Sequence, residues 1–219
     1  MTLGLEKKIS SYFTDRTKSD PFATQKGFLP GWLEQVRIHA FQQILESNVA
    51  LQKGVLWDLL NGKVYVVIDF YLTAIVALYS DEAILWLDHH ANNSDYEIFM
   101  RRENLLSWYP DRKDQLIQLL VETKFNFLGE PRLIRSATDI PETEDKNTGA
   151  QKRLTAVIPK LFSPIYAQNL DGSMQLKFCV WSRISGKVFA ITCSLGPENT
   201  FSYSGDMLAR ETGSYFTPR

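Results

Sequence analysis

An Asn-Gly pair between two apolar runs is the feature that most constrains the fold of this chain. Asn61 and Gly62 follow one apolar run and precede the next, and this dipeptide favours the two-residue turn of a β-hairpin. In the register set by such a turn, Trp57 faces Val66 and one face of the ribbon is apolar throughout. The sequence therefore predicts an antiparallel hairpin with one buried face.

Two more apolar segments follow the predicted hairpin. Residues 74–79 and 83–88 are separated by the polar residues 80–82, a pattern that continues an antiparallel meander. Segment 83–88 also contains good helix formers, so a helix there is the alternative. The stretch 64–87 contains several acidic and many β-branched residues, which favours strands over a membrane-spanning helix.

Helices are predicted where apolar side chains recur at three- and four-residue spacing. Pro30 favours the start of one helix, and Pro110 favours the end of another. The predicted helices span residues 3–13, 33–45, 96–108 (after a cap within 92–95) and 111–121 (capped by Asp111).

The C-terminal third of the chain contains three turn signals. They lie at Asp171-Gly172, at Ser185-Gly186 and within residues 196–199, and they divide this part into strand-like runs. The predicted strands span residues 154–168, 173–182, 187–194 and 200–204. This arrangement indicates a second antiparallel meander.

A polar stretch separates the two meanders. Residues 131–152 lack an apolar period, which is typical of an exposed loop or linker. We expect a half made of helices and a meander over 1–130 and an antiparallel meander over 153–219, either as two domains or as one. The predicted fold class is α+β, with antiparallel β-meander sheets and helices packed on one face.

The composition is that of an ordinary soluble globular protein. The 219 residues carry a formal net charge of -1 at pH 7, so no strong field attracts nucleic acid or an anionic membrane. The first residues become charged before any apolar run develops, unlike those of a signal peptide, and a cytoplasmic location is expected. Cys179 and Cys193 lie in predicted strands, where free thiols act as small buried apolar groups.

Familiar catalytic motifs are absent from the sequence. It contains no glycine-rich nucleotide-binding loop, no Gly-x-Ser-x-Gly elbow, no His-Glu-x-x-His and no Cys-x-x-Cys, and no organic cofactor is indicated. His39, His89 and His90 are its only imidazoles, so any histidine base or ligand comes from these three. His39 lies near the edge of the apolar face of helix 33–45 and is interpreted as a partly buried structural residue.

The strongest candidate site combines carboxylates with imidazoles. Asp88, His89 and His90 come where a predicted strand gives way to a polar loop, and Asp69 ends an earlier predicted strand. Adjacent histidines point to opposite faces of a regular strand, but both can approach one ion once the strand has ended. The four side chains suit a divalent metal such as manganese or zinc.

The segment that begins at Asp88, Asp-His-His-Ala-Asn-Asn, together with Asp69, resembles the third motif of the Asp-His-His phosphoesterases. The resemblance covers a short part of the chain and implies manganese-dependent hydrolysis of phosphodiesters or pyrophosphate. That family also has an upstream His-x-x-x-Asp-x-Asp motif and a parallel sheet. Here His39 is followed by Ala-Phe-Gln-Gln-Ile, and the predicted hairpin is antiparallel.

Two weaker patterns have plain structural interpretations. Glu122 and Lys124 have the Glu-x-Lys spacing of a nuclease motif, but they end a predicted helix, and a solvated helix terminus is the preferred interpretation. A basic patch for nucleic acid would combine four cations with two aromatic rings. Acidic residues are interleaved with them, so ion pairing on a solvated surface is preferred. The patch residues are Arg101, Arg102, Arg112, Lys113, Trp108 and Tyr109, and the acids are Glu97, Glu103, Asp111 and Asp114.

Two functional hypotheses follow. The preferred one is a soluble, non-enzymatic module of otherwise unknown role that binds a partner protein or a small ligand across its sheet. The alternative is a metal-dependent, phosphoesterase-like hydrolase that uses Asp69, Asp88, His89 and His90. The sequence leaves open whether the chain is an enzyme, which ligand it binds and what its oligomeric state is.

Overall fold

The computed structural model describes residues 49–68, 73–81, 83–87, 93–128, 130–140, 148–198, 200–210 and 212. The helices predicted over 3–13 and 33–45, together with His39, lie outside the described residues. No helix in the described part of the chain is long and apolar enough to cross a membrane.

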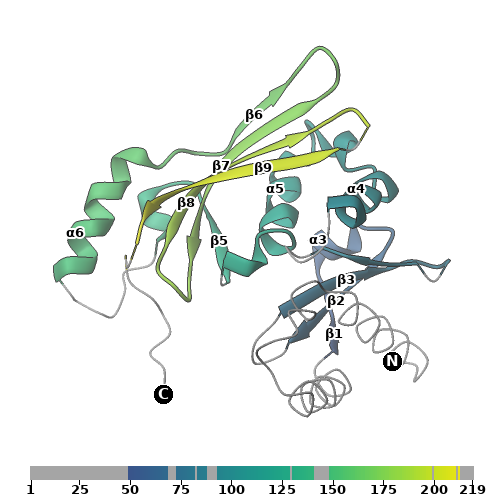
Figure 1. Ribbon diagram of the computed structural model, residues 1–219, viewed down its shortest axis with the longest axis horizontal. Helices are drawn as coiled ribbons and strands as arrows, with labels where there is room; N and C mark the ends of the chain where they lie inside the picture. Colours follow the sequence, from purple (N-terminus) through teal and green to yellow (C-terminus); the bar gives the residue numbers. More distant parts are fainter. Residues whose placement is uncertain are drawn as a thin grey trace, which may run out of the picture.

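The first sheet is a four-stranded antiparallel meander. Its strands lie in the order β1-β2-β3-β4, and Figure 1 shows β1, β2 and β3 in blue at the lower right of the view. The strands predicted at 74–79 and 83–88 are confirmed as β3 and β4, so the helical alternative for 83–88 is wrong. The strands are β1 (Val49–Leu51), β2 (Lys63–Ile68), β3 (Thr73–Leu78) and β4 (Ile84–Trp86).

The predicted hairpin around Asn61 and Gly62 is wrong. Residues Val55–Asp58 form a short helix, α3, instead of a strand, and the partners of β2 are β1 and β3. The backbone N–H groups of Asn61 and Gly62 donate to the carboxylate of Glu103 instead of lying in a turn between strands. A two-residue hairpin would pair Leu60 with Lys63, but the preceding segment is helical and Lys63 pairs with Leu78 of β3.

Two helices connect the sheets. The predicted helix 96–108 is confirmed in its first part as α4 (Asn93–Arg102). It then stops, because Asn104 takes a left-handed conformation with φ 49° and a separate 3-10 helix, η1 (Leu105–Trp108), follows. The helix predicted over 111–121 is confirmed as α5 (Lys113–Glu122), although its N-cap is Arg112 and not Asp111. A further 3-10 turn, η2 (Asn126–Leu128), comes after α5.

The second sheet is antiparallel and has five strands. Its order is β5-β7-β8-β9, and β6 also pairs with β7. The turns predicted at Asp171-Gly172 and Ser185-Gly186 are confirmed, and both glycines have positive φ angles of 82° and 59°. The strands are β5 (Pro131–Ile134), β6 (Ile165–Gln168), β7 (Met174–Ser182), β8 (Val188–Leu195) and β9 (Phe201–Ala209).

The segment predicted as a loop or linker contains regular structure. Within residues 131–152 lie β5, the 3-10 turn η3 (Ala137–Asp139) and the start of helix α6 (Thr148–Val157). Because α6 and the 3-10 turn η4 (Ile158–Lys160) precede β6, the strand predicted over 154–168 is correct only from Ile165. Residues 141–147 lie outside the described residues. The division of the chain into two domains stays a prediction.

One hydrophobic core joins both sheets. Its largest cluster contains side chains of both sheets and of the two connecting helices, such as Ile75, Phe99, Leu120 and Phe178. A smaller cluster on the opposite face of the second sheet contains side chains of β5, β7, β8 and α6, and Figure 1 shows α6 beyond one end of that sheet. The predicted α+β class with antiparallel sheets is confirmed. Cys179 and Cys193 are free and buried, as expected.

Candidate functional site

The four predicted metal ligands lie in two short segments of the sequence. Asp69, Asp88, His89 and His90 all lie outside the described residues. Among the residues that are described, no group of three or more His, Cys, Asp or Glu side chains is arranged to hold a metal ion. The metal site therefore stays a prediction.

The Glu-x-Lys pattern does not form a solvated helix terminus. Glu122 ends α5 and accepts a hydrogen bond of 2.8 Å from Gln118, and burial raises the pKa of its carboxyl. Lys124 is only 1 % exposed, and its ammonium nitrogen lies 5.5 Å from the centre of the Tyr96 ring. The expectation of a solvated helix terminus is wrong for Lys124, because its aliphatic chain and its ammonium group are both buried.

The residues of the basic patch, the alternative that the sequence analysis did not prefer, make separate contacts. Trp108 is 5 % exposed, so its ring is not available to stack on a base. Arg102 pairs with Asp81 in the turn between β3 and β4, whereas Lys113 lies 4.9 Å from the centre of the Tyr166 ring in β6. Arg102 thus forms an ion pair at the surface with the first sheet, whereas Lys113 contacts the second sheet.

A buried carboxylate organises the end of α4. Glu103 is 4 % exposed, and its Oε1 accepts hydrogen bonds from the Gly62 N–H at 2.9 Å and from the Tyr79 hydroxyl at 2.6 Å. Its Oε2 accepts from the Asn61 N–H at 2.6 Å. Burial, followed by the bond to Glu103, raises the pKa of the Tyr79 hydroxyl. A buried carboxylate that accepts three hydrogen bonds is stabilising, because neither the carboxylate nor its donors remain unsatisfied.

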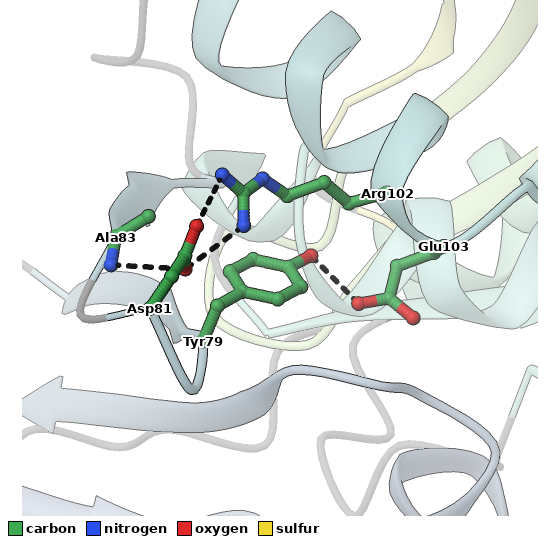
Figure 2. A network of polar contacts seen from close by, with 5 residues as sticks. All are labelled: Tyr79, Asp81, Ala83, Arg102 and Glu103. Atoms are coloured by element: carbon green, nitrogen blue, oxygen red, sulfur yellow. Dashed lines mark hydrogen bonds and ion pairs between the residues drawn. The ribbon is translucent and has the colours of Figure 1, made fainter.

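The outer side of this network is an ion pair. Figure 2 shows Arg102 reaching across the Tyr79 ring to Asp81, with both guanidinium nitrogens bonded to the carboxylate at 3.0 and 2.9 Å. The guanidinium carbon lies 4.7 Å from the ring centre, and the bonds from Arg102 lower the pKa of Asp81. The network attaches the end of α4 to the first sheet, and its groups are engaged with one another, so its role is structural.

The second sheet, by contrast, ends in a long strand with an open side. In the described part of the chain, β9 pairs with β8 and with no other strand. Figure 1 shows β9 running along the margin of the sheet. We call its residues 201–207 the β9 edge. Six consecutive residues of it, 202–207, are exposed.

The direction of the backbone groups follows from the contacts at the start of β9. The Phe201 N–H donates to Oε1 of Glu97 in α4 at 3.1 Å, whereas the Thr200 carbonyl accepts from Gly196 in the adjoining turn. Backbone groups along a strand alternate between its two sides. The N–H and C=O groups of Tyr203, Gly205 and Met207 therefore point away from β8, and no hydrogen bond among the described residues engages them.

The two faces of the β9 edge differ in polarity. Tyr203 and Met207, on the side of the connecting helices, are 41 % and 39 % exposed, and the Tyr203 ring packs edge-on against Phe125 with centres 5.1 Å apart. The opposite face carries Ser202, Ser204 and Asp206, in register with Ser194, Thr192 and Ala190 of β8. A strand added here would meet apolar side chains on one face and polar ones on the other.

A hollow beside this edge is too small for most ligands. It lies between the β6–β7 and β8–β9 turns and has a volume of about 210 Å³, whereas small-molecule pockets usually enclose roughly 300–1,000 Å³. The polar residues that line it include Asn169, Ser173, Gln175, Ser194, Thr200 and Ser202.

Sequence reasoning missed the β9 edge as a site. The alternation of Phe201, Tyr203 and Met207 with small or polar residues was a signal for a strand longer than the predicted 200–204. No family model, curated protein or solved structure matches this chain.

Proposed function

We propose that this chain is a non-enzymatic module that binds a partner protein through its second sheet, with β9 as the strand to which the partner adds. The observation that carries the proposal is the outward direction of the backbone groups of Tyr203, Gly205 and Met207. Rows of such groups on an edge strand are a template for another strand, which satisfies them by main-chain hydrogen bonds.

The ends of β9 are blunted, but its middle is not. Glu97 occupies the N–H of Phe201 at one end, and a register shift between Val188 and Phe189 disturbs the ladder near the other end. Bulges, charges and covering side chains are the usual protection of edge strands. Between these points only Asp206 adds a charge, so the stretch from Tyr203 to Met207 is the part suited to accept a partner.

A protein partner is favoured over a small ligand because the hollow beside the edge is small and the exposed edge is extended. The two buried free cysteines are compatible with the cytoplasmic location expected from the sequence. The alternative hydrolase rests on the sequence pattern of Asp69, Asp88, His89 and His90. Its test is a thermal melt of the full chain with and without a chelator, because a bound metal adds to stability.

The proposal is tested with a matched pair of substitutions at Gly205. Gly205→Pro removes an outward N–H and leaves the bonds to β8, a position at which edge strands tolerate proline. Gly205→Ala keeps the N–H, and its Cβ would meet only ordinary contacts at 3.9 and 4.0 Å. Wild-type and variant chains are immobilised and exposed to an extract of the source organism, and the retained proteins are quantified by mass spectrometry.

We expect at least one protein to be retained by the wild type and by Gly205→Ala, and to be lost from Gly205→Pro. Circular dichroism of the three chains checks that each is folded. Equal retention by all three chains would contradict the use of the β9 edge, and so would the absence of any protein enriched over a blank resin.

A further inference from the structure

We infer that the β9 edge pairs with the same edge of a second copy of this chain, antiparallel and centred on Gly205. The inference rests on the proposed function, because it requires that the edge accept a strand. The partner is a second copy because the two protected ends of β9 allow one favourable register between identical edges.

Three residues have outward backbone groups between the two protected ends. These are Tyr203, Gly205 and Met207. A two-fold axis at Gly205 sets each Gly205 opposite the other and sets Tyr203 opposite Met207 of the second copy. Every opposed pair of this kind exchanges two hydrogen bonds, so this register engages all of the outward groups in the open stretch.

Neighbouring registers are less favourable. An axis at Ser204 would set Met207 opposite Phe201, whose N–H already donates to Glu97. An axis at Asp206 would set two carboxylates directly opposite each other, which is destabilising in a sheet. The charge pattern and the capped end therefore select Gly205 as the centre.

The side chains of the Gly205-centred pair are complementary on both faces. Tyr203 and Met207, each exposed by about two fifths, would cover one another, and aromatic or apolar pairs across strands are stabilising. On the other face, Ser204 would lie opposite Asp206 of the second copy, so that a hydroxyl donor meets a carboxylate acceptor.

The interface is expected to be weak. Three opposed pairs with two bonds each fall below the roughly ten hydrogen bonds of a standard interface, and a single added strand buries less than the roughly 1,600 Å² of such interfaces. The net charge of -1 per chain gives no strong repulsion between copies. We expect a dissociation constant on the order of 1–100 µM, as for small transient interfaces.

Sedimentation velocity of the full chain tests the inference, over about 1 to 300 µM so that the expected affinity is bracketed. The average mass of the wild type should rise from the monomer mass of 25.1 kDa toward twice that value, and Gly205→Ala should behave alike. Gly205→Pro and Met207→Lys should each weaken the dimer at least about tenfold, because one removes an outward N–H and the other places a charge opposite Tyr203. Circular dichroism and thermal melts check that these variants are folded.

A wild-type chain that stays monomeric over the whole range overturns the inference. So does a dimer that Gly205→Pro and Met207→Lys leave unchanged. The two proposals fail separately: a monomer that still retains extract proteins in a Gly205-dependent manner overturns the second copy as the partner and leaves the proposed function intact.

Discussion

At position 62 the small size of glycine matters more than its backbone freedom. A Cβ on Gly62 would lie 2.9 and 3.0 Å from two ring carbons of Tyr79 and 3.2 Å from Oε1 of Glu103. Gly62 is not among the described glycines with positive φ, so the conformational reason that favours glycine in a hairpin turn does not apply here. The residue allows the chain to approach a buried phenol and carboxylate.

Gly62→Ala should therefore destabilise the protein. Overpacking of a well-packed site costs about 1–3 kcal/mol of unfolding free energy, and the Tyr79 ring is buried and held by Glu103. Urea denaturation measures the change, with Gly205→Ala as the control because its Cβ has room. Equal stability of the two variants would contradict the close contact at Gly62.

Glu103→Gln should weaken the attachment of α4 to the first sheet. Glutamine is nearly isosteric, but its amide group turns donor hydrogens toward the N–H of Asn61 or Gly62, which also donate. Leaving buried donors unsatisfied costs about 1–3 kcal/mol. In the exposed pair of the same network, Asp81→Asn should cause a smaller loss that salt reduces further. Denaturation at low and high salt separates the two cases, and a larger effect at Asp81 would contradict the assignment.

Two buried groups with raised pKa values should make the protein less stable as the pH becomes alkaline. Burial raises the pKa of the Tyr96 hydroxyl and of the Cys193 thiol, so the native state keeps protons that the unfolded chain releases. The contribution of these groups is complete below their unfolded pKa values of about 8.5 for cysteine and 10 for tyrosine, and it is lost as the pH rises through and above them. Urea unfolding between about pH 8 and 11 should show this fall. Tyr96→Phe should reduce it in the tyrosine range, and an unchanged slope would contradict the assignment.

At the scale of elements, local signals predicted those strands and helices whose partners are near in sequence. β3, β4, α5 and the β7–β8 hairpin are confirmed, because alternation, helical spacing and turn residues agree there with the final packing. The Asn61-Gly62 hairpin failed because the segment before it forms α3 and β2 pairs with β1 and β3, while Glu103, far along the chain, accepts from both backbone N–H groups. The strand β5 was missed because its apolar residues are too few for a period and its partner β7 lies beyond α6.

The β9 edge was predictable only in part, because its place in the sheet depends on contacts between distant parts of the chain. The alternation around Gly205 indicates a strand. Nothing in that alternation tells which strand of a sheet lies at its margin, because strand order is set by long-range pairing. The metal site predicted at Asp88, His89 and His90 lies outside the described residues, so it was neither found nor contradicted.

Sequence reasoning missed Asn104 as a signal for the end of α4, and substitutions at this residue test its role. Asn104 adopts φ 49° and ψ 46°, a left-handed conformation that asparagine and glycine tolerate better than other residues. Asn104→Ala should destabilise the protein by about 1 kcal/mol, whereas Asn104→Gly should be close to neutral. Thermal and urea unfolding of both variants measure the difference. If alanine were tolerated as well as glycine, the left-handed helix end would be contradicted.

At the scale of the whole molecule, the core argues for joint unfolding of the two sheets. Ile75 and Leu85 of the first sheet belong to the same buried cluster as Phe178 and Leu195 of the second, with Phe99 of α4 between them. A domain boundary drawn between the sheets would divide this cluster. Each half alone would then expose apolar side chains that the other covers, and such exposure is unfavourable in proportion to its area.

We therefore expect β3 and β8 to lose protection at the same urea concentration. Pulsed hydrogen exchange followed by mass spectrometry measures the unfolded fraction of peptides from each strand in a single titration. Coincident midpoints are the signature of one cooperative unit, and Phe99→Ala should shift both midpoints together by removing a side chain that is fully buried in the shared cluster. Two separate midpoints, or a shift confined to one sheet, would instead favour two domains divided within residues 131–152.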